Sequence, residues 1–572
     1  MPSPPAYDYD FLVIGSGFGG SVSALRLSEK GYRVGVLERG MRYRAEDFPK
    51  TNWNIRKSLW IPLLRCFGIL RLSLFRDVFV LSGSGVGGGS LVYANTLYVP
   101  PDAFFQAPQW AGMRDWKATL MPHYRRAQFM LGVTQNEFES EPDRLLAEVA
   151  GDMGRGDTYV RTPVGVYFGE PGKTVPDPYF NGAGPERSGC TLCGGCMVGC
   201  RHGAKNTLDR NYLYFAEKLG AEVHPMRTVT DVRPLPEGGY EVEHVRTGAW
   251  LAKDRRVTRA KNVVFAAGVL GTVELLLKCK ERGSLPNLSN MVGRRVRTNS
   301  EAILAASTRR KDADWSKGIA ITSSVHPDDV THVEPVRFSE GSDALAMLAT
   351  LLTDGGPGMP RWRRFLKEAI RRPLDVLRAA WPFGRAKRGV FLLVMQTLDN
   401  SISLTLRRSW RSFFRRALDT DRGDGTPNPS YIPIANQVAR SFAQKADGMA
   451  YSSVMEVLID VPTTAHILGG ACMGSSPEDG VVDEKGEVFG HPGLYVCDGS
   501  IIPANLGVNP SLTIAALAEH VMSQIPVREG AEYRPAIDPA FVERRLREIE
   551  LLAQETGSPS LQRRRLPMAS GA

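Results

Sequence analysis

The hydrophobic pattern near the N-terminus changes from a continuous apolar run to a helical spacing and then to a second apolar run. Residues 11–14 read Phe-Leu-Val-Ile, which is typical of a buried strand. A glycine-rich segment at 15–20 follows, and the apolar residues of 22–27 then recur at helical spacing. The second apolar run lies at 33–38. The order predicts a strand, a tight turn, a helix and a strand within residues 8–40.

The turn has the sequence Gly-Ser-Gly-Phe-Gly-Gly, the G-x-G-x-x-G pattern of dinucleotide-binding units. We expect Gly15 to permit the turn, Gly17 to let the backbone approach a pyrophosphate, and Gly20 to allow close packing of helix on strand. The N-terminus of the helix supplies N–H donors to the phosphate. Glu38 ends the second strand, where its carboxylate can bind both ribose hydroxyls and repel a 2′-phosphate, which disfavours NADP. FAD and NAD both remain open at this point.

Two later segments, 318–325 and 390–406, alternate enough to be predicted as strands. Between them, residues 360–387 combine apolar residues at helical spacing with many arginines, and the run 407–416, which contains Trp410 and Phe413, continues this pattern. Such a helix can lie in a lipid headgroup layer. The alternative is an ordinary helix with its apolar face on the protein and its arginines in water.

Composition narrows the class of protein. A chain of 572 residues with 43% hydrophobic and 23% charged residues is typical of a soluble globular protein with two interlocked domains. The net charge of +10 allows attraction to nucleic acid or to phospholipid headgroups. Nucleic acid is disfavoured, because the chain lacks zinc-finger pairs and an aromatic RNP-type strand.

No apolar run is long enough to span a bilayer, and residues 1–9 lack the basic start of a signal peptide. We therefore expect a cytoplasmic protein, with membrane contact that is at most peripheral.

Further glycine-rich segments carry a family resemblance. Residues 82–95, Ser-Gly-Ser-Gly-Val-Gly-Gly-Gly-Ser-Leu-Val-Tyr-Ala-Asn, resemble the first signature of the glucose–methanol–choline (GMC) oxidoreductases. Residues 263–276 look like the second signature, and 494–500 followed by 507–514 resemble the closing flavin contact and active-site segment. The resemblance extends from about residue 8 to about residue 525. It implies that the dinucleotide is FAD.

The resemblance also implies an α/β fold with a discontinuous Rossmann-like FAD-binding domain, 1–300 and 462–530, into which a cysteine-rich loop, 188–206, is inserted. Residues 301–461 are expected to form an α+β substrate-binding domain whose antiparallel or mixed sheet covers the flavin. Residues 531–572 are expected to form a helix, at 541–553, and a disordered tail. The residues expected to contact FAD are Gly15, Gly17, Gly20, Glu38, Gly85, Gly88, Gly89, Ser90, Asn95, Val229, Ala267, Gly268, Asp498, Gly499, Asn509 and Pro510.

Within the family, segments 17–21, 94–101 and 465–470 are similar to the cholesterol oxidase branch, and to its actinobacterial members in particular. This implies FAD-dependent oxidation of a bulky lipid alcohol, such as a 3β-hydroxysteroid, to the ketone. By resemblance, His466 positions the substrate hydroxyl and accepts or relays its proton, and Asn509 contacts the substrate oxygen or the flavin edge. The electron acceptor is either O2 or a carrier.

In that branch a buried glutamate also isomerises the 5-ene-3-ketone to the 4-ene-3-ketone, and Glu334 is the candidate by position. A carboxyl group whose pKa is raised by an apolar pocket suits such a proton abstraction. The alternative is an ionised and inert Glu334 paired with Arg337.

Cys190, Cys193, Cys196 and Cys200 have the spacing C-x2-C-x2-C-x3-C, which matches the ferredoxin run for an iron–sulfur cluster. Arg201 follows Cys200, at a position where ferredoxins have proline. A cluster could use these four cysteines, or three of them with Cys472 or Cys497, and either set would depart from the ferredoxin pattern. The other interpretation is a glycine-rich loop with reduced thiols. A cluster would favour a dehydrogenase over an oxidase.

Two further functions remain open: a GMC dehydrogenase for another lipid alcohol, which passes electrons to a carrier, and a non-catalytic flavoprotein or sterol-binding protein.

Overall fold

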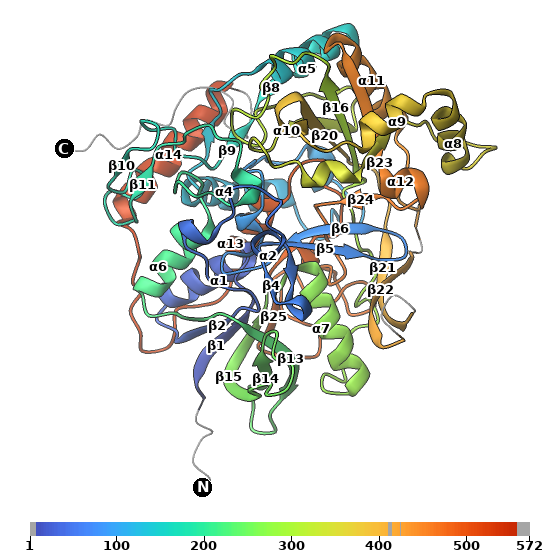
Figure 1. The fold of residues 1–572 in the computed structure, drawn as a ribbon. Helices are drawn as coiled ribbons and strands as arrows, with labels where there is room; N and C mark the ends of the chain where they lie inside the picture. Colours follow the sequence, from blue (N-terminus) through green and yellow to red (C-terminus); the bar gives the residue numbers. More distant parts are fainter. Residues whose placement is uncertain (1–6, 410–413, 424, 557–572) are drawn as a thin grey trace.

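The computed structural model describes residues 7–409, 414–423 and 425–556 (Figure 1). The predicted N-terminal unit is present, since β1 (Tyr9–Ile14) lies parallel to β2 (Val34–Leu37) and α1 (Phe18–Glu29) connects them. All of β1 after Tyr9 is buried, which agrees with its continuous apolar run.

β1 lies inside a seven-stranded mixed sheet. The strand order is β12 (Glu222–His224), β2, β1, β15 (Arg256–Phe265), β14 (Tyr240–Arg246) and β13 (Arg227–Pro234), with β25 (Leu494–Val496) also paired to β15. The first half of β15 pairs antiparallel with β14, and its last three residues pair parallel with β25. The carboxyl ends of β1, β15 and β25 therefore meet at one edge of the sheet, although they are far apart in sequence.

Helices cover this sheet. α1 packs against α13 (Ser511–Ser523), and α13 packs against α4 (Trp116–Met130). Arg26 of α1 and Glu519 of α13 form a buried ion pair with 2.7 Å between Nε and Oε2. The helix predicted at 541–553 is present as α14 (Pro539–Thr556), which contacts α4. The predicted disordered tail beyond it lies outside the described residues.

A second, five-stranded sheet is antiparallel throughout. Its strand order is β18 (Thr331–Val336), β20 (Gly389–Gln396), β16 (Ala302–Thr308), β23 (Gly448–Ser453) and β19 (Ala349–Leu351). All of these strands come from residues 302–453, whereas the mixed sheet uses residues on both sides of that range. The domain boundaries themselves stay a prediction.

The two strands predicted across 318–325 and 390–406 are wrong in extent. Gly318 exchanges backbone hydrogen bonds with Leu192 and Gly194 of the cysteine-rich loop, so only β17 (Ser323–Ser324) of the first segment is a strand. The second segment bends after β20, and β21 (Ile402–Arg408) then pairs with β22 (Arg416–Arg422) in a separate hairpin. Apolar and polar side chains alternate both before and after the bend, so the hydrophobic pattern of the sequence does not show where the strand is interrupted.

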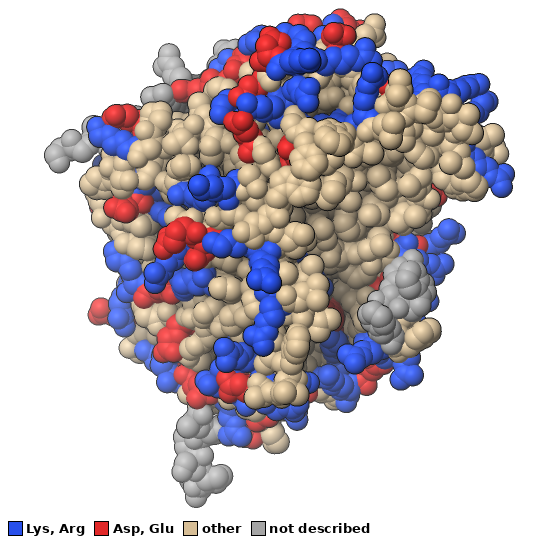
Figure 2. Space-filling model, in the orientation of Figure 1, with Lys and Arg blue, Asp and Glu red and all other residues tan. Residues whose placement is uncertain are grey.

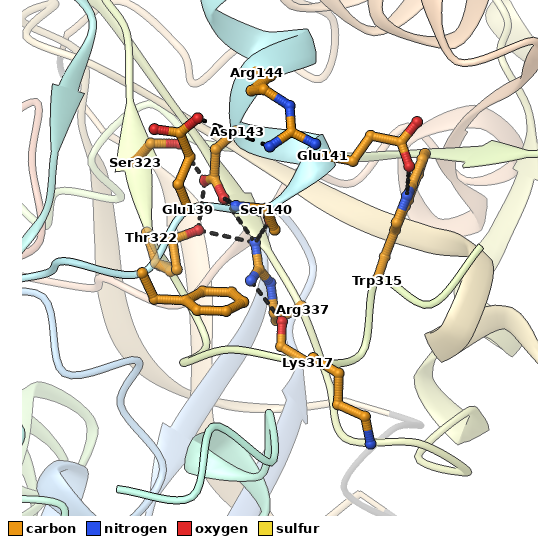
Figure 3. Close-up of polar contacts among 12 residues, drawn as sticks. Glu139, Ser140, Glu141, Asp143, Arg144, Trp315, Lys317, Thr322, Ser323 and Arg337 are labelled. Carbon is orange, nitrogen blue, oxygen red and sulfur yellow. Dashed lines mark hydrogen bonds and ion pairs between the residues drawn. The ribbon is translucent and has the colours of Figure 1, made fainter. Parts of the chain in front are cut away.

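A buried ion pair holds α5 (Glu141–Asp152) against the antiparallel sheet (Figure 3). The guanidinium of Arg337 donates to the Lys317 carbonyl and the Thr322 hydroxyl, each at 2.8 Å, and lies 3.4 Å from the Asp143 carboxylate. Glu334 and Arg337 are an odd number of positions apart in extended chain, so their side chains point to opposite faces. The alternative pairing of Glu334 with Arg337 is therefore wrong.

The basic segment forms α8 (Arg361–Arg371) and α9 (Pro373–Ala380), which project from the molecule (Figure 1). Ile370 is 81% exposed, Leu374 64% and Leu377 67%. The interpretation that this apolar face packs on the protein is therefore correct only in part, since Phe365 and Val376 do pack against the buried cluster of Leu351, Ala379 and Tyr451. Trp410 and Phe413 lie outside the described residues. Among the described helices, none combines the length and the hydrophobicity that a membrane span requires.

Candidate active site

A cavity of about 590 Å³ extends from the carboxyl edge of the mixed sheet to the antiparallel sheet. At the mixed sheet its wall includes Gly15, Gly17 and Glu38. At the antiparallel sheet its wall is mainly apolar, with Ser452 and Ser453 of β23 as polar members. The apolar side chains there include Ile303, Ile321, Val336, Phe338, Phe391 and Leu393. We call this second end the apolar chamber.

The glycines of the N-terminal turn have different physical roles. Gly15 has φ +104°, and a Cβ on it would lie 2.3 Å from the carbonyl oxygen of Ala266. A Cβ on Gly20 would lie 2.0 Å from the oxygen of Gly15, so close packing of helix on strand requires glycine there. A Cβ on Gly17 would meet nothing within 4 Å. The protein itself therefore tolerates a side chain at Gly17, which borders the cavity.

Glu38 is buried at the end of β2 and lines the cavity. Its Oε2 accepts hydrogen bonds from the Ser16 amide at 3.0 Å and the Ser16 hydroxyl at 2.7 Å, and its Oε1 accepts one from the Gly40 amide at 2.7 Å. These bonds hold the carboxylate at the position predicted for a ribose contact, and Oε1, which accepts one bond, keeps a lone pair.

The second glycine segment follows β6 (Phe79–Gly83) and includes the short helix η3 (Gly88–Leu91). Gly88 and Gly89 line the cavity, and a Cβ on Gly88 would lie 2.6 Å from the Cα of Gly17. Of the predicted FAD contacts, the following line the cavity: Gly15, Gly17, Glu38, Gly88, Gly89, Val229, Ala267, Gly268, Asp498, Gly499, Asn509 and Pro510. Gly20, Gly85, Ser90 and Asn95 do not, and Ser90 instead bonds the Gly87 carbonyl and the Leu208 amide.

Asp498 lies just after β25 and connects the turn that follows β15 to the segment that follows β25. Its Oδ2 accepts from the Gly268 amide at 2.9 Å and the Thr272 hydroxyl at 2.6 Å, and its Oδ1 accepts from the Ser500 amide at 2.8 Å. Burial raises the pKa of this carboxyl, and the hydrogen bonds oppose that rise.

His466 lies beside the glycine loop because β24 (Thr463–Thr464) pairs with β6. Its Nδ1 bonds the carboxylate of Glu301, which is fully buried and also accepts the Ala465 amide at 2.6 Å. Burial lowers the pKa of His466, but the field and hydrogen bond of Glu301 outweigh it and raise that pKa. Glu301 was not identified from the sequence, where no motif surrounds it.

Asn509 is held by a fixed loop. The Oδ1 of Asn299 accepts hydrogen bonds from the Leu506 amide at 3.0 Å and the Gly507 amide at 2.8 Å. The Nδ2 of Asn299 donates to the Val508 carbonyl at 3.0 Å. The Asn509 Nδ2 donates to Glu334 Oε2 at 3.2 Å. Its buried Oδ1 has no hydrogen-bond partner within the described residues. Asn509 lines the cavity, so this oxygen is available to a ligand.

Glu334 lies on β18, behind Asn509, and has no exposed surface. Its Oε1 lies 3.1 Å from His332 Nε2. Burial raises the pKa of Glu334 to about 8, although the bond from Asn509 and the charge of His466 lower it. The structure thus brings together His466, Asn509 and Glu334, the residues predicted to be catalytic.

The cysteine-rich loop passes close to the cavity, which Met197 lines. Its four cysteines are free thiols, and the described residues contain no group of three or more His, Cys, Asp or Glu side chains placed to hold a metal ion. The donor set does not fit an iron–sulfur cluster and agrees with the alternative of reduced thiols.

The chain is similar to known oxidoreductases. Residues 385–518 match the model of the GMC oxidoreductase family. A cholesterol oxidase of Mycobacterium tuberculosis is 54% identical over 92% of this chain and 93% of its own. One of Acinetobacter baumannii is 48% identical over 92% of this chain and 96% of its own.

The chain belongs to the GMC oxidoreductases. Solved structures of low identity show the same fold. Pyridoxine 4-oxidase from Mesorbium loti has a TM-score of 0.58 at 14% identity, covering 90% of this chain and 98% of its own. A formate oxidase of Aspergillus oryzae has a TM-score of 0.59 at 15% identity, covering 91% and 98%. The chain is an FAD-dependent alcohol oxidoreductase of this family.

The cavity fits FAD on its own geometry. The turn around Gly17 and the carboxylate of Glu38 stand where pyrophosphate and ribose bind in such units. The hydroxyls of Ser82 and Ser84 line the cavity and, like Asn509 Oδ1, are buried without a partner in the described part of the chain. Buried polar atoms of this kind are satisfied by a ligand or by water.

We expect Gly17→Val to fold normally but to lose FAD. The valine side chain meets no protein atom at its Cβ, yet it occupies space that the pyrophosphate needs. Far-ultraviolet circular dichroism and flavin absorbance of the purified variant measure the two effects. Gly112→Val is the matched control, because its Cβ also meets nothing within 4 Å, away from the cavity. Full FAD occupancy in Gly17→Val would contradict this placement.

Proposed function

We propose that this protein oxidises a 3β-hydroxysteroid, such as cholesterol, to the 3-ketosteroid and passes the electrons to O2. The proposal rests on one observation. The His466–Glu301 pair and the unpartnered Asn509 oxygen both lie at the cavity, where it reaches the apolar chamber. The cholesterol oxidases that share 54% and 48% identity with this chain support the sterol and oxygen assignments.

Bound FAD supplies the acceptor for the hydride of the carbinol carbon. Glu301 occupies Nδ1 of His466, so Nε2 is the nitrogen left to receive the proton of the substrate hydroxyl. The carboxylate behind the ring stabilises the imidazolium that forms. The chamber surrounds the carbon skeleton with apolar side chains and excludes water.

Anaerobic mixing with a 3β-hydroxysteroid is expected to bleach the flavin absorbance, and His466→Gln should slow the bleaching by about 10²–10⁴-fold, the usual contribution of a general base. His244→Gln is the control, because His244 lies on β14 and does not line the cavity. Absence of bleaching in the FAD-loaded wild type would reject the sterol, and an unaffected rate in His466→Gln would reject the role of His466.

We also propose that Glu334 is the base that moves a proton from C4 to C6 and so isomerises the 5-ene-3-ketone. A carboxylate with a raised pKa is a stronger base than an exposed one, and Asn509 places it beside the chamber. Abstraction requires the ionised form. Because the pKa of Glu334 is raised to about 8, this form becomes abundant only as the pH rises through that value.

The ratio of isomerisation to oxidation is therefore expected to rise with pH up to about 8 in the wild type. In Glu334→Gln the 5-ene-3-ketone should accumulate at every pH, while oxidation continues. The ratio is measured from the absorbance of the conjugated enone and the amount of hydrogen peroxide. Glu456→Gln is the control, a second fully buried glutamate with a pKa raised to about 7 that pairs with Arg361 instead. An unchanged enone yield in Glu334→Gln would exclude this residue as the base.

The exposed face of α8 and α9 supports delivery of the sterol from an anionic lipid surface. Figure 2 shows uncharged surface with basic side chains at its margin over these helices, whose exposed residues include Ile370, Leu374 and Leu377. Basic residues around the apolar face suit the negative charge of phospholipid headgroups. α9 contacts β19, where Ala349 lines the cavity, and the neighbouring Met347 is 54% exposed. The apolar surface thus adjoins the chamber.

The triple variant Ile370→Ser, Leu374→Ser, Leu377→Ser is expected to lower binding to anionic vesicles by at least about tenfold, since burial of each such side chain contributes about 1.5–3 kcal/mol. Turnover of vesicle-embedded cholesterol should fall with it, and turnover of a water-soluble 3β-hydroxysteroid should not. Vesicle co-sedimentation and peroxide release measure both. Leu251→Ser, which removes a 97% exposed leucine elsewhere, should change neither. Equal binding by the triple variant would reject this surface.

A further inference from the structure

Glu334 is the inner end of a continuous hydrogen-bonded chain that leaves the active site on the side away from the chamber. Its Oε1 lies 3.1 Å from His332 Nε2, and His332 Nδ1 lies 3.1 Å from His326 Nε2. Glu334 has no exposed surface and His332 is 1% exposed, whereas His326 is partly exposed. The chain therefore runs from a buried carboxyl group to the surface in two steps.

We propose that His332 and His326 form a proton path that connects Glu334 with solvent. The inference rests on the proposed role of Glu334 as isomerisation base. That role requires Glu334 to lose its proton, yet its other oxygen bonds Asn509 and a sterol would fill the apolar chamber in front of it. The two histidines give the proton a route that does not open the chamber.

Both imidazoles suit such a path. Burial and the charge of His466 lower the pKa of His332 to about 3. Burial and the charges of His332 and Arg155 lower the pKa of His326 to about 3 as well. A hydrogen bond with the Thr331 backbone and the charge of Asp328 oppose the second shift. Both rings are therefore neutral at neutral pH, with one nitrogen donating and the other accepting. Neutral rings at hydrogen-bond distance pass protons without a stable buried charge.

The transfer balances as one proton. Protonated Glu334 gives its proton to Nε2 of His332, Nδ1 of His332 gives its proton to Nε2 of His326, and His326 releases a proton from Nδ1 to water. Glu334 is left as the carboxylate, both rings have changed tautomer, and no electrons move. The reverse sequence returns a proton from water.

The surroundings of both rings favour this role over packing alone. Tyr98 lies edge-on to His332 with 5.1 Å between ring centroids, and its hydroxyl bonds Ser324, so it does not interrupt the chain. The backbone of His326 is fixed separately, since its carbonyl accepts from Arg155 Nε at 3.2 Å and its amide donates to the Thr158 hydroxyl at 3.0 Å. Removing the His326 side chain therefore leaves the loop anchored.

Solvent deuterium in the isomerised product reports the path. While Glu334 holds the substrate proton, exchange through the histidines replaces it, so in D2O the holoenzyme should place deuterium at C6 of the conjugated enone made from added 5-ene-3-ketone. In His326→Ala and His332→Gln, we expect the deuterated fraction of the enone that forms to fall by about tenfold, the low end of what positioned proton carriers contribute. Mass spectrometry and enone absorbance measure the two quantities.

Added imidazole should restore deuterium incorporation in His326→Ala, whose site reaches the surface, and not in buried His332→Gln. Tyr98→Phe, next to the path but outside it, should match the wild type. Unchanged incorporation in both histidine variants would overturn the path, as would an isomerising wild type that takes up no deuterium. Persistent isomerisation in Glu334→Gln would instead reject the proposed base, so the two failures are distinguishable.

Discussion

Direct contact between backbones at the carboxyl edge of the mixed sheet is the constraint on which the site depends. A Cβ on Gly19 would stand 1.6 Å from the carbonyl oxygen of Cys497, and one on Gly88 would stand 2.6 Å from the Cα of Gly17. Any side chain at Gly19 or Gly88 would force these segments apart. The contact gathers a turn, a loop and a strand end from distant parts of the chain, so the cavity exists only in the complete fold.

Burial beside the apolar chamber governs the protonation of Glu334 and His332, which do not line the cavity themselves. Removal from water raises the pKa of the Glu334 carboxyl and lowers that of the His332 imidazole, which keeps both neutral. His466 differs only because the carboxylate of Glu301 lies against its ring. The same low-polarity surroundings that accept a lipid alcohol thus contain one histidine supported by a carboxylate and one neutral hydrogen-bonded chain, and each suits a different proton transfer.

The cysteine-rich loop has a structural role that its spacing conceals. Lys205, near the end of this loop, donates to the Leu91, Tyr93 and Cys196 carbonyls, and so ties the loop to the flavin-side glycine segment. The Gly194 amide donates to the Gly318 carbonyl, and the Gly318 amide donates to the Leu192 carbonyl, which ties the loop to the substrate side. The spacing of cysteines in the sequence fixes only their positions along the chain. A metal site also requires their sulfur atoms to converge on one point in space.

The sequence by itself determined the N-terminal strand, turn, helix and strand, because glycine freedom and hydrophobic period are local properties. Motif resemblance also identified His466, Asn509 and Glu334. It did not reveal Glu301, which lies 165 positions from His466, or the bonds from Glu334 to His332 and His326. The tertiary structure was needed to show which charged group faces which, that Arg337 binds Asp143 and not Glu334, and that Ile370, Leu374 and Leu377 of α8 and α9 stay in solvent. Burial and pairing arise from contacts between distant segments, and a local pattern of residues does not contain them.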